Sequence, residues 1–337
     1  MPAQSLQITV IYNPETKNAS EEVSLTDEDN GKTATVIADS LRRCGYESSI
    51  YAVSEKNLYY LKHKKTDAFF NVCEASDLYM RVVKQLEKAG RVFTGPGPSV
   101  MALTVDKVAT KRTFEHVGIP TPLWQSFDSG KEPLNPLLHY PLIVKPVNED
   151  CSIGINQLSI VYDEQTLRER IDTIIHSYHQ SALVEEFIVG KELHCTIVGN
   201  GNEAQVLPLA ELQFDDGHID DTFIFDYEAK WVEGSPRYKN TFVSPAPSIN
   251  AAVTKRIQDD AKRAFLALDM KDYARFDIRY NAHTGLWYFL EANANPSIQS
   301  QEEATSISAH ASGLHYHEFI KKIMDSCASR HLGTVVT

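Results

Sequence analysis

The chain has 337 residues, 42% of them hydrophobic, and a formal net charge of −12. This length supports two or three domains, and the scattered basic residues disfavour a nucleic-acid or membrane surface. The five cysteines lack CxxC spacing, which excludes an obvious zinc site and disulfide framework. No apolar run approaches the ~20 residues of a membrane span, and "MPAQSLQ" lacks the features of a leader. We therefore expect a cytoplasmic globular protein that acts on small molecules.

The first third of the chain alternates strand and helix patterns. "LQITVIYN" predicts a strand, Lys32–Cys44 a helix, and the residues after Gly45 a second strand. "TDAFFNVCEA" predicts a third strand, "DLYMRVVKQLEKAG" a helix, and "RVFTG" a fourth strand. Such alternation is typical of a parallel sheet with helices on both faces. We expect an α/β lobe over residues 1–119.

The pattern changes after Pro120. "VMALTVDKVATKRTFEHVGIPTP" predicts one helix that ends near this proline, and short strands with a helix at "DEQTLRERIDTIIHSY" follow. We expect two α+β lobes, at 120–195 and 196–330. The polar stretch "DDGHIDDTFIFDYEAKWVEGSPRYKNTF" predicts a long loop that closes on ligand. "INAAVTKRIQDDAKRAFLALDM" predicts an amphipathic helix, two strands come next, and "SISAHASGLHYHEFIKKIMDSCAS" predicts a terminal helix.

The two strands in "YARFDIRYNAHTGLWYFLEANANP" predict a hairpin with its turn at "NAHTG". A turn centred on His283 places Asp277 opposite Phe289 and Arg275 opposite Glu291. Since strand side chains alternate, both acids would project from one face as diagonal neighbours, roughly 7–8 Å apart.

This hairpin face is rich in polar side chains. Asp277, Glu291 and Asn293 together offer two carboxylates and an amide oxygen, which suit Mg²⁺ that also binds phosphate. A solvated hairpin face with a salt bridge explains the same residues equally well.

Two further stretches offer groups suited to a nucleotide. In "PLIVKPVNEDCSIGI", Lys145 ends an apolar strand, and a polar loop with Ser152 follows, as polyphosphate binding requires. In "ALVEEFIVGKELHCTIV", Glu185 and Glu192 flank a turn that could present backbone groups to a purine and a carboxylate to a ribose. Taken alone, the first stretch is more simply explained by a solvated lysine at the end of a strand. The second is more simply explained by an ordinary hairpin with surface glutamates.

Taken in order, the stretches resemble the ATP-grasp superfamily, and most closely the D-alanine–D-alanine ligases. The similarity runs from "VFTGPGPSVMALTVDKVATKRTFEHVGIPTP" through "LIVKP", "LVEEFIVGKE", "FDYEAKW" and "ARFDIRY" to "FLEANANPS". The N-terminal "ASEEVSL" also looks like a segment of the family's first lobe. The resemblance implies an ATP-grasp fold, in which a parallel α/β lobe precedes two α+β lobes that enclose ATP, and a possible homodimer.

By motif position, the resemblance also implies roles for individual residues. Nucleotide-binding groups would be Lys107, Lys145, Glu185, Ile188, Glu192 and Lys230. Ligands of two Mg²⁺ ions, for which Mn²⁺ could substitute, would be Asp277, Glu291 and Asn293. Groups at the reacting phosphate would be Arg275, Lys230 and Ser152. The implied reaction is ATP-dependent ligation, in which a carboxylate attacks the γ-phosphate and an amine displaces phosphate from the acyl phosphate.

Several positions near the substrates depart from the family pattern. The glutamate that holds the first substrate's ammonium is replaced by Ser20, and "CEASDLYM" replaces the family's histidine-glycine and "GEDG" loop. Glu22 and Glu74 are candidates to supply the missing acid. The remaining departures, which lie in the phosphate loop, the closing loop and the acceptor site, are Cys151, Trp231, Ser297, Gln301 and Glu302.

Because the nucleotide and metal groups persist while the substrate groups change, we expect the same chemistry on another pair of substrates. A D-alanine–D-alanine ligase with an unusual substrate shell is the alternative. A non-catalytic ATP-binding protein is a third possibility, which the retained lysines and metal ligands disfavour.

Overall fold

The first sheet of the computed structural model is parallel. The structure describes residues 6–14, 30–73, 77–215, 223–245 and 247–332. The central strand β1 (Gln7–Tyr12) lies between β2 (Glu47–Ala52) and β3 (Ala68–Asn71). The fourth strand predicted at "RVFTG" is wrong: only Phe93 forms a bridge, to Phe69, because the chain turns away at Gly95, where φ is +86°.

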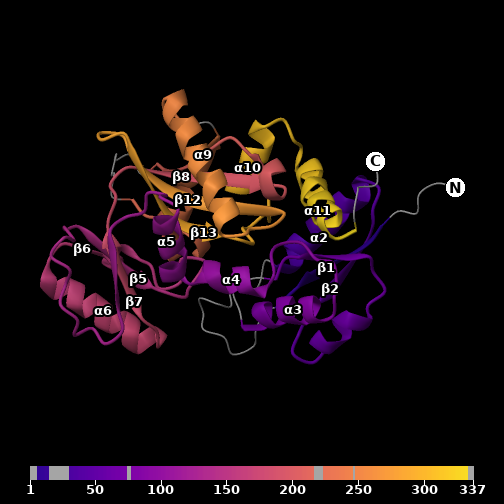
Figure 1. The fold of residues 1–337 in the computed structure, drawn as a ribbon, viewed down its shortest axis with the longest axis horizontal. Coiled ribbons are helices and arrows are strands. Elements are labelled where there is room, and N and C mark those ends of the chain that lie inside the picture. Colours follow the sequence, from indigo (N-terminus) through magenta and orange to yellow (C-terminus); the bar gives the residue numbers. More distant parts are fainter. Residues whose placement is uncertain (1–5, 15–29, 74–76, 216–222, 246, 333–337) are drawn as a thin grey trace.

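Helices on both sides of this sheet bury apolar faces. They are α2 (Asn30–Arg43), α3 (Asp77–Lys88) and the 3₁₀ helix η1 (Leu58–His63). The C-terminal helix α11 (Tyr316–Leu332) packs along α2, as Figure 1 shows. Phe319, Ile323 and Met324 of α11 join Val10 and Ile37 in one apolar core.

Two helices predicted as single elements are each divided in two. α4 (Pro98–Val105) ends at Asp106, whose carboxylate caps α5 (Lys107–His116) by accepting from the Ala109 N–H. The predicted terminal helix is divided into α10 (Ala304–Ala311) and α11 at Gly313, where φ is +92°.

The second sheet is antiparallel and has four strands. Its order is β4 (Trp124–Phe127), β7 (Ala182–Glu186), β5 (Leu142–Pro146) and β6 (Ile160–Val161). Helix α6 (Glu164–Tyr178) covers one face of this sheet through Leu167, Ile171 and Ile174 (Figure 1). The short 3₁₀ helix η2 (Gln157–Ser159) precedes β6.

The third sheet has six strands, among them the predicted hairpin. In order these are β11 (Thr241–Pro245), β10 (Ala210–Phe214), β8 (Lys191–Val198), β12 (Tyr273–Asn281) and β13 (Leu286–Asn293), with β9 (Gln205–Val206) paired to β8. Leu193, Cys195 and Ile197 of β8 pack with the long helix α9 (Ala251–Ala267). The turn before β9 is the 3₁₀ helix η3 (Gly201–Glu203). The predicted fold class, α/β followed by α+β, is confirmed.

The lobe boundary expected after Cys195 falls within β8. All eight residues of β8 pair with β12 in the large sheet, so we propose that the second division lies near Gly190. Among the described residues, no helix has the length and apolar character needed to cross a membrane.

A buried carboxylate ties three parts of the chain together. Asp272, with φ at +65°, accepts hydrogen bonds from the Gly95 N–H at 2.9 Å and the Asn200 Nδ2 at 3.0 Å. It also pairs with Arg330 of α11, whose Nε and Nη2 lie 2.9 and 2.8 Å from the two carboxylate oxygens. Arg330 in turn donates to the carbonyls of Phe93 and Gly95. We call Asp272 and Arg330 the Asp272 clamp.

Candidate active site

A cleft of about 1220 Å³ collects nearly all of the predicted site residues. The small sheet contributes Lys145 and Glu185, and the large sheet contributes Glu192 and the polar face of the β12–β13 hairpin. Residues that sequence reasoning assigned and that line the cleft are Lys145, Ser152, Glu185, Ile188, Glu192, Lys230, Arg275, Asp277, Glu291 and Asn293. Lys107 does not line the cleft, but its Nζ lies 3.8 Å from Glu291 Oε2.

The β12–β13 hairpin brings its two acids closer than expected. Asp277 lies directly opposite Glu291, and Arg275 opposite Asn293. The predicted register is therefore wrong, because a bulge between Asp277 and Ile278 leaves Leu290 without a partner on β12. Directly opposed residues have Cβ atoms about 4.5–5.5 Å apart, so the bulge concentrates negative charge at one point of the cleft.

The carboxylate of Asp277 accepts hydrogen bonds from two neighbouring side chains. Arg275 donates to both carboxylate oxygens, from Nε at 2.6 Å and Nη2 at 2.9 Å, and Asn293 Nδ2 donates at 3.2 Å. Burial opposes ionisation of Asp277, but Arg275 outweighs it and holds the pKa well below its usual range. Burial raises the pKa of Glu291; Lys107 opposes that shift, and Asp277 adds to it. A cation at Glu291 would relieve this repulsion.

The donor set fits Mg²⁺ only together with a phosphate. Two carboxylates and an amide oxygen are hard ligands, but they are too few for octahedral Mg²⁺. Within the described part of the chain, no group of three or more histidine, cysteine, aspartate and glutamate side chains could hold a metal ion. Asp277, Glu291 and Asn293 thus suit a metal that takes its other ligands from a nucleotide and water.

Glu185 forms two buried ion pairs, one of them with a lysine that the sequence patterns did not single out. Its carboxylate contacts Lys145 Nζ and, at 2.5 Å, Lys111 Nζ. Lys111 is fully buried, and burial lowers its pKa to about 8 although Glu185 opposes the shift. The sequence could have indicated the position of Lys111, because it lies one helical turn after Lys107 in α5 and therefore on the same face of the helix. This network fixes the strand that leads to Ile188.

The loop that carries Ser152 adopts an unusual backbone conformation. Cys151 and Ser152 have φ of 58° and 61°, and a Cβ on Gly154 would lie 2.7 Å from Pro146 Cγ. Ser152 Oγ donates to the Phe225 carbonyl at 2.8 Å, and Trp231 Nε1 donates to the Cys151 carbonyl at 3.0 Å. The loop is therefore bonded to the segment predicted to close on ligand.

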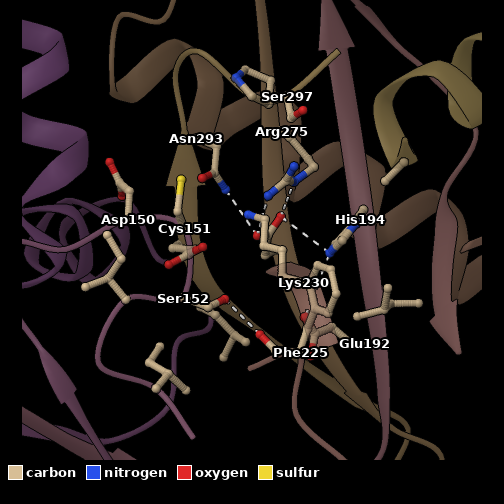
Figure 2. A pocket seen from close by; sticks show the side chains of 18 of the residues that line it. Asp150, Cys151, Ser152, Glu192, His194, Phe225, Lys230, Arg275, Asn293 and Ser297 are labelled. Atoms are coloured by element: carbon tan, nitrogen blue, oxygen red, sulfur yellow. Dashed lines mark hydrogen bonds and ion pairs between the residues drawn. The ribbon is translucent and has the colours of Figure 1, made fainter. Parts of the chain in front are cut away.

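That segment is more ordered than predicted. In its described part, α7 (Tyr227–Trp231) and α8 (Pro236–Asn240) replace the expected irregular loop. Asp226 caps α7 through the Ala229 N–H and pairs with Arg237 Nε at 3.1 Å. We call residues 223–240 the closing segment. It places Lys230 in the cleft that Arg275, Asn293 and Ser152 also line (Figure 2).

The structure describes only some of the positions that depart from the ligase pattern. Ser20, Glu22 and Glu74 lie outside the described residues. Ser297 and Glu302 line the cleft. Ser297 Oγ donates to Glu303 Oε1 at 3.2 Å, and Glu303, which was not anticipated, also lines the cleft at the start of α10. The predicted acceptor end therefore carries at least two carboxylates.

Comparisons with known proteins agree on one family. A model of the D-ala D-ala ligase C-terminus matches residues 113–325. The chain is 30% identical to the D-alanine–D-alanine ligase of Ralstonia nicotianae over 71% of this chain and 68% of that protein. It is also 30% identical to the uncharacterized protein y4sG of Sinorhizobium fredii, over 90% of this chain and 89% of that protein.

Solved structures share the fold over nearly the whole chain. The D-alanine–D-alanine ligase of Bacillus anthracis complexed with ATP superposes with a TM-score of 0.76 at 22% identity, covering 97% of this chain and 99% of that one. The VanG D-Ala:D-Ser ligase of Enterococcus faecalis gives 0.73 at 21% identity, covering 96% and 100%.

Proposed function

Because this chain belongs to the D-alanine–D-alanine ligase family of ATP-grasp carboxylate–amine ligases, we propose that it joins a carboxylate to an amine through an acyl phosphate. We propose further that its two substrates are not both D-alanine. The observation that carries this proposal is the pair of opposed carboxylates, Asp277 and Glu291, in a cleft that also holds Lys145 and Lys230. Phosphoryl transfer requires chiefly positioning and neutralisation of charge, which these groups can supply.

In the proposed mechanism, the residues bind and orient the nucleotide first. The backbone from Glu185 to Ile188 would meet the adenine, Glu192 the ribose, and Lys145 the phosphates. Asp277, Glu291 and Asn293 would hold two Mg²⁺ ions, which neutralise phosphate charge when bound. Mn²⁺ could substitute for Mg²⁺ in this proposal.

Three residues, Lys230, Arg275 and Ser152, would act at the reacting phosphate. Lys230 would contact the terminal phosphate as the substrate carboxylate attacks it, and Arg275, fixed by its two bonds to Asp277, would face the acyl phosphate. Ser152 would help to cover the phosphates. The closing segment would keep water from the acyl phosphate until the amine displaces phosphate. A homodimer, as implied by the family resemblance, is also part of the proposal.

A screen of carboxylate and amine pairs with ATP and Mg²⁺, measured by phosphate release, tests the function. We expect release that requires both substrates and yields equimolar ADP and amide product. ATP binding without turnover across a broad panel would instead favour a non-catalytic ATP-binding protein.

D-Alanine alone is expected to give little or no dipeptide. Glu302 is an exposed residue that lines the predicted acceptor end of the cleft, where its charge would repel a second carboxylate. We expect a larger or less anionic acceptor. The measurement is chromatography of D-alanyl-D-alanine. Robust formation, at a catalytic efficiency of about 10⁴ M⁻¹s⁻¹ or above, would identify the chain as a D-alanine–D-alanine ligase with an unusual shell.

Limited trypsin digestion is expected to show protection of the closing segment. Lys230 and the Ser152 loop would both contact bound phosphates, so nucleotide should stabilise the bonds between Ser152 and Phe225 and between Trp231 and Cys151. Cleavage at Lys230, Arg237 and Lys239 should slow when an ATP analogue, Mg²⁺ and substrate are added together. Cleavage at the exposed Lys131 serves as the control, and equal rates with and without ligand at all four sites would refute closure.

A further inference from the structure

His194 is a buried polar residue in the cleft to which no role has yet been assigned. In β8, side chains alternate, so Glu192, His194 and Thr196 share one face of the strand. That face looks into the cleft at Glu192 and His194. The neighbouring strand β12 places Asp277 directly beside His194. Figure 2 shows the imidazole on the same side of the cleft as Arg275, with Glu192 close by.

The imidazole of His194 has no hydrogen-bond partner within the described structure. It is only 3% exposed, and both Nδ1 and Nε2 are shielded from solvent and without a partner. Nε2 lies 3.8 Å from Glu192 Oε1 and 3.8 Å from Asp277 Oδ1, beyond hydrogen-bond range. A buried polar group left in this way destabilises the fold unless something else binds it.

Both carboxylates next to His194 already have an arginine partner. Glu192 pairs with Arg279 Nη2 at 3.1 Å, and Asp277 receives two hydrogen bonds from Arg275. A purely structural histidine between two acids would be expected to bond at least one of them. The ring is instead held in the cleft wall between residues that already have partners, which leaves its buried nitrogens without a hydrogen bond at the edge of the cleft.

We propose that His194 is a nucleotide-binding residue that donates a hydrogen bond from Nε2 to the α-phosphate. This inference rests on the proposed function, which places the ribose at Glu192 and the metal-bound phosphates at Asp277. Nε2 is equidistant from these two carboxylates, and the α-phosphate is the part of ATP that lies between the ribose and the outer phosphates. A neutral imidazole can make this bond through its N–H.

Competition with a fluorescent ADP analogue, without Mg²⁺, separates this role from others. For His194→Leu, the affinity for AMP and ADP should fall about tenfold to a hundredfold, as expected for a lost hydrogen bond to a charged group, while the affinity for adenosine stays within about twofold. His194→Gln retains a donor and should recover part of the loss. His283→Leu, at an exposed turn outside the cleft, is the matched control and should bind all three ligands normally.

Other outcomes would overturn the assignment. An equal loss for adenosine and AMP in a folded His194→Leu protein would show that the histidine only supports the cleft, and unchanged AMP affinity would show that it makes no contact. If His194→Leu does not fold, His194→Ala replaces it, because truncation removes both nitrogens without added bulk. Failure of the wild-type protein to bind ADP would count against the proposed function itself, so the two failures are distinguishable.

Discussion

Replacing Glu291 with glutamine is expected to reduce ATP-dependent ligation by about 10²–10³-fold or more, while the protein stays folded. Glu291 faces Asp277 across the bulged hairpin, and a neutral amide there would not offset the charge of a metal ion held by these residues. The loss should appear in kcat more than in the KM of the carboxylate or amine. Phosphate release with the substrate pair found by screening is the measurement.

The matched control is Glu203→Gln, which makes the same chemical change at the exposed turn η3, outside the cleft and the closing segment. It should leave turnover unchanged. A hairpin that serves only as a solvated, salt-bridged surface would tolerate both substitutions equally. Wild-type-like phosphate release by a folded Glu291→Gln protein would therefore reject the metal assignment.

Removing the charge of Asp272 is expected to cause the largest loss of stability. Asp272→Asn should lower the free energy of unfolding by about 3–5 kcal/mol, because it leaves the Arg330 guanidinium in the Asp272 clamp without its counter-ion. Asparagine tolerates the left-handed backbone at φ +65°, so this variant spares the backbone, while it removes the charge and one of the two oxygens that accept hydrogen bonds. Urea unfolding, followed by tryptophan fluorescence, measures it.

Asp269→Asn is the control, since Asp269 also has a positive φ, of 54°, but its side chain is 72% exposed. Its pair with Lys271 lies at the surface, where ion pairs contribute about 0–1 kcal/mol. Similar losses in both variants would mean that the backbone conformation, rather than the clamp, accounts for the effect.

The sequence predicted which residues gather in the cleft better than how they are arranged there. Alternation in β12 and β13 was sufficient to place Asp277 and Glu291 on one face, because facing depends only on a period of two. Their register depended on the turn and on the extra residue Leu290. A bulge has no signature in a run such as "WYFLEAN", so the acids were expected to be diagonal rather than opposed.

Contacts between distant segments were the other class of feature that could not be predicted. The inward position of Lys111 depends on Glu185 of β7, and the shielding of His194 depends on strands far away in the chain. The break between α4 and α5 at Asp106 was easier to predict from the sequence. An aspartate before a new helical run is a common N-cap, but continuous apolar periodicity across "VMALTVDKVATKRTF" obscured it.

The packing of α11 against α2 has a consequence for the order of folding during synthesis. The core beneath the first sheet contains Val10 and Ile37, yet it is completed by Phe319, Ile323 and Met324. On the ribosome, β1, α2 and β3 emerge when α11 has not been translated, so part of their apolar surface has no native partner for most of elongation. N-terminal domains usually fold first as the chain emerges. Here, the lobe that is synthesised first completes its core last.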